Sequence, residues 1–313
     1  ANLTPDEMQK LRNIVKKAIA DNVYKKKERI DSISDLTVST CIILIEELGM
    51  KSPSVIALIL YRPVVSQSTS IEEVEKLFGK DVADIVGGLT KVNSLEATQS
   101  AMASDNYIKL LISLAEDMRV ILIKIASRLH EIRCAESYNE QYRMRLAMEV
   151  SYRYTPLAHK LGLYNIKTEM EDLYLKYTDR EAYNYIKEKI SESKDARDKY
   201  IAEFIAPINE KLKDTDVRYD IKGRVKSISS INNKLKKQKV DFESIYDLFA
   251  IRIILDSELD KEKAECWQPY SIVTDLYMPN PKRLKDWLSI PKSNGYESLH
   301  TTVMGPESRW VEV

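Results

Sequence analysis

The sequence predicts an α+β protein with an all-α N-terminal domain followed by a small mixed α/β domain. The 313 residues include only 8 glycines, and 31% are charged, a composition that favours long helices over a turn-rich all-β fold. Residues 1–195 show no sustained alternation of apolar and polar residues, whereas residues 216–313 alternate segments of strand and helix character. A chain of this length can bury two hydrophobic cores.

Composition and charge exclude several classes of protein. The formal net charge is 0, so no global basic field gathers nucleic acid and any anion site must be local. Cys41, Cys134 and Cys266 are far apart and show neither a CxxC pair nor zinc-ligand spacing, which indicates inert thiols in a reducing compartment. The sequence has no apolar run of the ~18–20 residues that span a bilayer and no signal-peptide pattern. These features predict a cytoplasmic protein that does not contact a membrane.

The N-terminal half reads as successive helices with recognisable starts and ends. Thr4 lies three residues before Glu7, which is the spacing of a capping box, and Ser70 stands in the same relation to Glu73. Gly49 follows an apolar segment that it can terminate. The expected helices include residues 41–48, 54–61, 71–78 and an apolar stretch over 106–133 that Glu116, Asp117 and Lys124 interrupt.

A helical connector is predicted between the two domains. Its last helix, residues 191–209, carries an apolar stripe of Tyr200, Ile201, Phe204 and Ile205. The stripe indicates a helix packed on both domains, and a partner-binding surface is the alternative. No Pro/Gly/Ser-rich linker separates the halves, so we expect them to be mechanically coupled. The predicted division is an all-α domain at 1–150, the connector at 151–215 and the α/β domain at 216–313.

The α/β domain begins with a basic segment beside a helix start. Gly223 is expected to allow a sharp turn, and Arg224 and Lys226 follow in extended spacing before Ser227 opens a helix. Cations beside a helix N-terminus suit a polyphosphate. Ser230 and Lys234 share one face of that helix because they are four residues apart. The predicted elements are strands at 217–221, 250–255, 298–304 and 310–313, and helices at 228–238, 242–248 and 261–277.

Two charged residues lie in strands that are otherwise apolar. The run from Ala250 to Leu255 is expected to be buried on both sides except at Arg252, and such an arginine usually points at an anion. In the last strand, alternation places Trp310 and Glu312 on one face and Val311 on the other. One carboxylate therefore points out of an apolar strand.

Four segments of the C-terminal part resemble the synthetase domain of the RelA/SpoT homologue family. They are GRVKSISSINNK at 223–234, IYDLFAIRIIL at 245–255, RLKDW at 283–287 and NGYESLHTTV at 294–303. The resemblance continues upstream through residues 154–173 and 120–133, so it covers almost the whole chain. It implies a nucleotidyltransferase-like fold and an enzyme of the stringent response that makes the alarmone (p)ppGpp. The implied reaction transfers the β,γ-pyrophosphate of ATP to the 3′-hydroxyl of GDP or GTP.

The resemblance also assigns roles to residues of this chain. Asp247 matches a catalytic Mg²⁺ ligand, and Glu312 matches the residue thought to accept the proton of the 3′-hydroxyl. Two polyphosphates must meet in such a site, so cations and Mg²⁺ are needed to offset their repulsion. The residues that match the ATP site are Arg224, Lys226, Ser230, Lys234 and Arg252. Those that match the GDP or GTP site are Lys285, Lys292, Asn294, Tyr296 and His300, with the Tyr296 ring expected to stack on guanine.

In the same family the N-terminal half is an HD-type hydrolase that holds Mn²⁺ and removes the 3′-pyrophosphate. The positions that match its metal-binding residues are Thr37, Tyr61, Arg62, Val65, Ser66 and Ser127. None of them offers the imidazole or carboxylate that a transition metal needs. We therefore expect no Mn²⁺ there and a lost hydrolase activity. His130 and His159 are interpreted as packing residues. The role of this half remains open among a scaffold, a clamp on the synthetase and a nucleotide-sensing surface.

Three functions are compatible with these observations. A pyrophosphokinase that uses ATP, GDP or GTP and Mg²⁺ fits best, and a non-catalytic sensor of guanine nucleotides is the alternative. A residual (p)ppGpp hydrolase fits least well. Relatives are longer, so this chain is expected to be a part of a longer protein whose C-terminal regions contact the ribosome. No specific nucleic-acid site is expected within these 313 residues. The sequence does not indicate the preferred acceptor, the oligomeric state or the activating signal.

Overall fold

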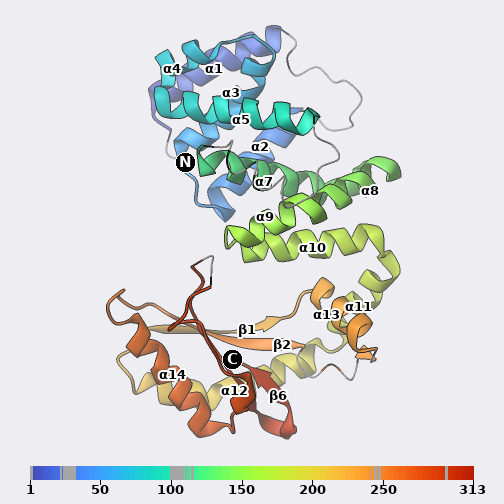
Figure 1. Ribbon diagram of the computed structural model, residues 1–313, viewed down its shortest axis with the longest axis vertical. Helices are drawn as coiled ribbons and strands as arrows, with labels where there is room; N and C mark the ends of the chain where they lie inside the picture. Colours follow the sequence, from blue (N-terminus) through green and yellow to red (C-terminus); the bar gives the residue numbers. More distant parts are fainter. Residues whose placement is uncertain are drawn as a thin grey trace. The chain divides into compact units, whose positions relative to one another are not determined.

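The structure is a computed structural model in which contacts divide the chain into two compact units, Ala1–His159 and Lys160–Val313. The first unit is helical over its described residues, and the second combines helices with a sheet (Figure 1). The predicted α+β class is therefore confirmed. No helix of the described part is both long and apolar enough to traverse a bilayer. The structure describes residues 3–21, 23, 33–98, 109, 111, 113, 116–239, 241–242, 245, 248–292 and 295–313.

Local sequence signals define the helix ends of the N-terminal unit. The Thr4 hydroxyl accepts the N–H of Glu7 at 3.2 Å, and Glu7 Oε2 accepts the N–H of Thr4 at 2.7 Å, which completes the capping box of α1. Ser70 Oγ accepts the N–H of Glu73 at 3.2 Å and caps α4. The helices are α1 (Pro5–Ala20), α2 (Ile33–Ile42) with a π-helical turn (Ile43–Glu47), α3 (Ser52–Val65), α4 (Ile71–Phe78), α5 (Lys80–Thr98), α7 (Met118–Arg133), α8 (Glu140–Glu149) with a π-helical turn (Val150–Tyr154), and α9 (Thr155–Lys160).

The apolar stretch predicted over 106–133 contains a helix boundary. α7 begins at Met118, Glu116 adopts a φ of 40°, and Asp117 Oδ1 accepts the N–H of Arg119 at 2.8 Å. Glu116 and Asp117 therefore precede the start of a helix instead of interrupting one. The Asp117 carboxylate accepts an N–H of the first turn, which has no carbonyl partner within the helix. Residues 106–108, 110, 112, 114 and 115 of that stretch lie outside the described residues.

Arg119 joins α7 to α5. Its Nη1 donates to Asp81 Oδ2 at 2.9 Å, and its Nε donates to Asp117 Oδ2 at 3.0 Å. Hydrogen bonds from Arg119 lower the pKa of both carboxyls, and the carboxylates raise the pKa of Arg119. The fully buried apolar side chains of this unit include Leu44, Ile56, Leu60, Ile85, Ile121 and Ile125.

The C-terminal unit combines helices with a four-stranded sheet in the order β1-β2-β6-β5. β1 and β2 are antiparallel, β2 and β6 are parallel, and β6 and β5 are antiparallel; β3 and β4 form a separate two-stranded ladder. The elements are α10 (Tyr164–Thr178), α11 (Arg180–Glu192), α12 (Lys194–Lys213), β1 (Tyr219–Val225), α13 (Ile228–Gln238), β2 (Phe249–Leu255), α14 (Glu262–Leu276), β3 (Lys285–Asp286), β4 (Leu299–His300), β5 (Thr302–Met304) and β6 (Trp310–Glu312).

The apolar stripe of α12 lies in the core of the C-terminal unit. Tyr200 and Phe204 are buried, and Ile201 and Ile205 pack against the same cluster, which also holds residues of α14 and the sheet. The stripe is therefore covered within this unit, and its interpretation as a partner-binding surface is wrong. The helices from Lys160 onward fold with the sheet. A distinct connector at 151–215 remains a prediction.

Two expectations about strands were wrong. Gly223 is not at a turn but in the middle of β1, paired with Ile251. It is needed because α12 lies close: a Cβ at this position would be 2.9 Å from Ile201 Cγ2. β2 is not buried on both sides, since Ile254 is 45% exposed. Only one face of β2 packs on the core, so burial alternates along the strand.

Burial makes two of the cysteines unreactive. It raises the pKa of the Cys41 thiol to about 11 and also raises that of Cys266. Both thiols are therefore protonated at neutral pH, and the thiolate is the reactive form. None of the three cysteines, all of which the structure describes, forms a disulfide.

Candidate functional site

The four-stranded sheet buries one face and presents the candidate site on the other. Ile251 and Val311 belong to the core cluster with α12 and α14. Side chains alternate along a strand, so Ala250 and Glu312 point to the opposite face. Strand pairing aligns Arg224 with Ala250, Ala250 with Glu312, and Glu312 with Thr302. A single row across the sheet thus holds a guanidinium and a carboxylate on either side of a small alanine.

A cavity of about 800 Å³ opens on this face of the sheet. Side chains from β1, α13, β2 and the segment before β4 line it, together with Glu312 of β6. Arg224 and Arg252 both line it, so two guanidinium groups border the space that an anion could occupy. The predicted residues that line this cavity are Arg224, Lys226, Ser230, Lys234, Arg252, Tyr296, His300 and Glu312.

A second cavity of about 580 Å³ is strongly cationic. Lys226, Lys234, His300 and Glu312 line it as well as the larger cavity, so these four residues are common to both. The other cations come from the segment at the start of β3. They are Lys282, Arg283 and Lys285. The predicted acceptor residue Lys285 therefore lines the same cavity as Glu312, and the cavity suits a ligand that carries several negative charges.

Glu312 lies between the side chains of a lysine and a histidine. Its Oε2 is 3.5 Å from Lys226 Nζ, and its Oε1 is 3.7 Å from His300 Nδ1. His300 contributes most to a lowered pKa of Glu312, Lys226 contributes next, and burial opposes both; the result is a pKa of about 2. Glu312 is therefore fully ionised at neutral pH.

The loop that carries Tyr296 is built around a glycine. Gly295 has a φ of 75°, which only glycine adopts readily, and its N–H donates to the carbonyl of Lys292 at 2.8 Å. Lys292 Nζ lies 4.8 Å from the centre of the Tyr296 ring and 4.9 Å from that of Trp287. The Tyr296 hydroxyl lies 3.0 Å from His300 Nε2. The structure thus brings Lys292, Tyr296 and His300 together.

The N-terminus of α13 already has a carboxylate partner. Asp172 of α10 accepts the N–H of Ser229 at 2.7 Å and, more weakly, that of Ile228 at 3.4 Å. The hydroxyl of Ser227 accepts the N–H of Ser230 at 3.2 Å. The sequence suggested that this helix start suits a polyphosphate, but its first amides are bonded within the protein. A phosphate here would meet side chains and not those amides.

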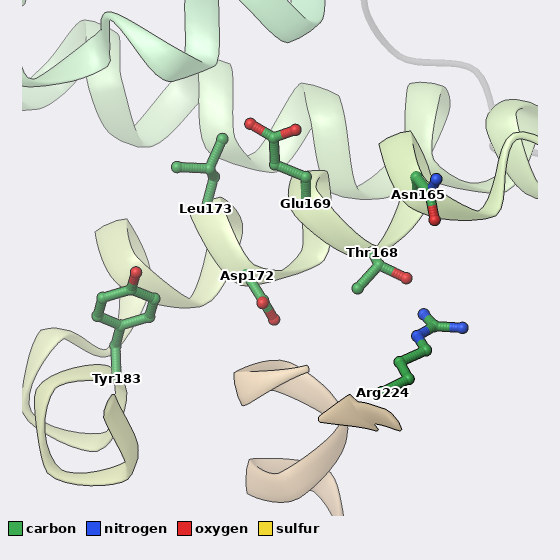
Figure 2. A pocket seen from close by; sticks show the side chains of 7 residues that line it. All are labelled: Asn165, Thr168, Glu169, Asp172, Leu173, Tyr183 and Arg224. Atoms are coloured by element: carbon green, nitrogen blue, oxygen red, sulfur yellow. The ribbon is translucent and has the colours of Figure 1, made fainter. Parts of the chain in front are cut away.

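Asp172 also lines a shallow cavity of about 470 Å³ between α10, α11 and β1. Figure 2 shows Asp172 and Thr168 on one side of α10, while Glu169 and Leu173 point away from Asp172. Arg224 approaches the same side from β1. Thr168 and Arg224 line both this cavity and the larger one.

Sequence reasoning missed several residues of the larger cavity. Thr168 comes from α10 and lies in the segment 154–173 that resembles the family, but no pattern in that segment assigns it a role. Ser257 Oγ and Ser298 Oγ are buried and have no hydrogen-bond partner within the described residues, although both line the cavity. Serine in NGYESLHT was a detectable signal, because a hydroxyl can contact a polar ligand. Two predicted residues, Asp247 and Asn294, lie outside the described residues.

The positions that match the hydrolase metal site lie on α2, α3 and α7, which contact one another. Ser127 Oγ donates to the carbonyl of Ile123 at 2.9 Å, and Ser66 Oγ donates to that of Pro63 at 3.1 Å. Both hydroxyls are therefore used within the protein. Val65 is 50% exposed. Among the residues that the structure describes, no group of three or more His, Cys, Asp or Glu side chains could hold a metal ion.

Comparison with known proteins relates both units to one family. Residues 13–164 match the model of the HD domain, and residues 223–313 match that of a region found in RelA / SpoT proteins. A GTP pyrophosphokinase of Myxococcus xanthus is 35% identical over 274 residues, which are 86% of this chain and 36% of that protein. The chain belongs to the RelA/SpoT family. This confirms the resemblance seen in the motifs.

Other RelA/SpoT relatives are named for synthesis, hydrolysis or both. The bifunctional (p)ppGpp synthase/hydrolase SpoT of Escherichia coli (strain K12) is 33% identical over 271 residues, which are 86% of this chain and 38% of that protein. A guanosine-3′,5′-bis(diphosphate) 3′-pyrophosphohydrolase of Aquifex aeolicus (strain VF5) is 34% identical over 267 residues, 85% of this chain and 37% of that protein. The chain thus spans little more than a third of these relatives. The RelA/SpoT match begins at Gly223, so it does not include Thr168 or Asp172.

Proposed function

We propose that the C-terminal unit is a GTP/GDP 3′-pyrophosphokinase that makes (p)ppGpp from ATP and GDP or GTP. The observation that carries the proposal is the row of Arg224, Ala250 and Glu312 across one sheet face, in a cavity rich in cations. Such a site can hold two polyphosphates and present a carboxylate between them. Membership of the RelA/SpoT family supports the same substrate class.

The reaction joins the acceptor oxygen to the β-phosphorus of ATP. The 3′-hydroxyl oxygen forms a bond to the β-phosphorus, the bond from that phosphorus to the α,β-bridging oxygen breaks, and AMP leaves. The hydroxyl proton passes to a carboxylate oxygen of Glu312. A positioned general base typically accelerates a reaction by about 10²–10⁴-fold.

The cations divide between donor and acceptor. Arg224 and Arg252 lie on the same face of neighbouring strands and hold the donor. Lys226 and Lys234 line both cavities and offset the charge where the two nucleotides meet. Lys285, with its basic neighbours in the second cavity, holds the acceptor phosphates.

An aromatic ring and a metal ion complete the proposed site. The Tyr296 ring, presented by the turn at Gly295, stacks on the acceptor base, an interaction worth about 1–3 kcal/mol per base. The carboxylate of Asp247 is a hard oxygen ligand of the kind that Mg²⁺ prefers, and its neighbour Leu248 accepts the N–H of Lys226 at 2.9 Å. Mg²⁺ bound there would neutralise phosphate charge.

The N-terminal unit is proposed to have lost the hydrolase. The side chains at the matching positions include an arginine, a valine and two serines whose hydroxyls donate to backbone carbonyls. This donor set does not fit a transition metal. We therefore derive no hydrolytic step for this chain.

The test is an assay of products from paired incubations. With ATP, Mg²⁺ and GDP or GTP, the protein should release AMP and form the 3′-pyrophosphorylated nucleotide in equal amounts. Glu312→Gln should lower kcat by about 10²–10⁴-fold. Glu307→Gln is the matched control, because Glu307 precedes the same strand but pairs with Arg309 at 3.0 Å on the surface.

The outcomes separate the proposed function from its alternatives. No product from ATP and GDP or GTP, together with retained nucleotide binding, would indicate a sensor. Release of pyrophosphate from ppGpp with Mn²⁺ would show that the hydrolase survives. Equal loss of turnover in Glu312→Gln and Glu307→Gln would remove Glu312 from the reaction.

A further inference from the structure

Three side chains form a connected series from the acceptor loop to Glu312. The Tyr296 hydroxyl lies 3.0 Å from His300 Nε2, and His300 Nδ1 lies 3.7 Å from Glu312 Oε1. Lys226 Nζ contacts the other carboxylate oxygen at 3.5 Å. The His300 and Glu312 side chains are 30% and 33% exposed, so solvent screens their contact only in part.

Backbone pairing holds His300 beside Glu312. The N–H of Thr301 donates to the carbonyl of Val313, and the N–H of Val313 donates to that of Thr301, both at 2.9 Å. Thr302 pairs with Glu312 in the next position of this ladder. His300 and Glu312 therefore lie diagonally on one face of adjacent segments, a spacing at which side chains interact.

The Tyr296 hydroxyl lies within hydrogen-bond distance of His300 Nε2, and the direction of that bond fixes which ring nitrogen carries a proton. A neutral imidazole has one N–H donor and one acceptor nitrogen. If the phenol donates to Nε2, the ring proton lies on Nδ1 and faces Glu312. The distance of 3.7 Å is that of an electrostatic contact and is longer than a full hydrogen bond. The ring thus orients Oε1 and leaves the carboxylate ionised.

We propose that His300 is a positioning residue for the general base Glu312, and that the Tyr296 hydroxyl sets the tautomer of His300. This rests on the proposed pyrophosphokinase function. Tyr296 then has two separate roles, since its ring face meets the acceptor base and its hydroxyl acts on the base catalyst. The competing role for His300 is direct contact with an acceptor phosphate.

Several charged groups surround His300 and Glu312. The charged groups that face this pair are Lys226 after β1, Lys234 on α13, Lys282, Arg283 and Lys285 at the start of β3, and Lys292 beside Tyr296.

Two substitutions of His300 distinguish positioning from phosphate binding. His300→Asn keeps a nitrogen near the place of Nδ1, and His300→Gln keeps one near the place of Nε2. If His300 orients Glu312, Gln should lower kcat by about 10- to 100-fold, as loss of an orienting partner commonly does, and Asn should recover most of that loss. If His300 binds phosphate through Nε2, the acceptor KM should rise instead and Gln should be the better replacement, which would overturn the proposal.

Tyr296→Phe tests the hydroxyl without removing the ring. The acceptor KM should stay within about twofold and kcat should fall about 10-fold. The acid limb of the kcat profile should move to higher pH, because a weaker contact from His300 raises the pKa of Glu312. In the His300→Asn background the same change should have no further effect, because Nε2 is gone. If the two substitutions lower kcat by independent factors that multiply, Tyr296 does not act on Glu312 through His300.

The tautomer can be measured without turnover. The chain has 3 histidines, so ¹⁵N-detected ring spectra are simple, and His300→Asn assigns the signal of His300. The full chain should show the proton on Nδ1, and Tyr296→Phe should shift it towards Nε2. A proton on Nε2 in the unaltered protein would refute the proposed role of the Tyr296 hydroxyl, even if the protein makes (p)ppGpp efficiently. Absence of synthesis with the expected tautomer would instead refute the proposed function alone.

Discussion

Asp172 offers a direct test of how α10 supports the candidate site. Its carboxylate accepts the N–H of Ser229 at 2.7 Å and that of Ile228 at 3.4 Å at the start of α13. α13 carries Ser230 and Lys234, which line the larger cavity. Asp172→Ala removes the carboxylate, so the N–H groups of Ser229 and Ile228 lose this acceptor and the helix start loses a negative charge.

The expected loss of stability follows from the two contacts. The bond to Ser229 is short, and a hydrogen bond to a charged group contributes about 1.5–3 kcal/mol. The bond to Ile228 is long and adds little. The negative charge at a helix N-terminus contributes a further 0.3–1 kcal/mol, roughly. Because Asp172 is only half-buried, we expect Asp172→Ala to lower the free energy of unfolding by about 2–3 kcal/mol.

Tryptophan fluorescence measures this loss in the C-terminal unit. The 3 tryptophans of the chain are Trp267, Trp287 and Trp310, all within Lys160–Val313, so urea unfolding followed by their emission reports on that unit. Glu171→Ala is the matched control. Glu171 is the neighbouring residue and pairs with Lys167 of the same helix at 2.8 Å, and a helical pair four residues apart is worth about 0.3–0.5 kcal/mol.

The comparison with the control can refute the reasoning. If Asp172→Ala and Glu171→Ala destabilise the C-terminal unit equally, the cap on α13 contributes nothing beyond a surface charge. Asp172→Asn keeps an acceptor oxygen and should lie between Asp172→Ala and the unaltered protein. A full loss in Asp172→Asn would assign the effect to charge alone and not to the hydrogen bond.

Three further outcomes follow from packing and charge. Gly223→Ala should destabilise the C-terminal unit by about 1–3 kcal/mol, because the new Cβ meets Ile201 Cγ2 at 2.9 Å; the loss should shrink when Ile201→Ala is added, and strict additivity in urea unfolding would count against that contact. Glu312 has a pKa lowered from 4.5 to about 2, so it stabilises the fold above pH 4.5 and this contribution is lost as the pH falls towards 2; the stability difference between the unaltered protein and Glu312→Gln should shrink over the same range, and a difference that is constant with pH would contradict the pairing. Arg119→Met should cost the N-terminal unit about 1.5–3 kcal/mol through Asp81, seen by circular dichroism but not by tryptophan emission; an equal change in both signals would refute a local effect.

Motifs and alternation predicted the parts of the site that are local in sequence. The helix predicted at 228–238 has the bounds of α13, Ile228–Gln238, because Ser227 is a strong cap. Alternation placed Glu312 opposite Val311, and Val311 is in the core. These features depend on residues within one or two turns of each other, and such patterns are visible without a structure.

Features that depend on distant residues could not be predicted in the same way. The need for glycine at position 223 comes from Ile201 on another element, so the residue itself suggested only flexibility. Asp172 on α10 caps the N-terminus of α13, and no spacing within residues 223–234 indicates that an acidic residue of another helix does so. Strand order also depends on tertiary packing. β2 pairs with β6, although α14 and three short strands lie between them in the sequence, and strands of two residues such as β3 and β4 are too short for a pattern.

Two carboxylates of the C-terminal unit contact N–H or cationic groups that would also attract phosphate. Asp172 bonds the first amides of α13, and Glu312 lies between Lys226 and His300. Glu312 offsets part of the positive charge of half-buried Lys226, and Asp172 accepts amides of α13. Removing such a partner from a half-buried polar group is costly. A phosphate that binds Lys226 must therefore exchange partners with Glu312, so the electrostatic gain from this lysine is smaller than that from a lysine without a carboxylate neighbour. In the proposed reaction, this exchange would draw Lys226 towards phosphate and away from Glu312, and it would raise the pKa of the carboxylate that is proposed to accept the proton.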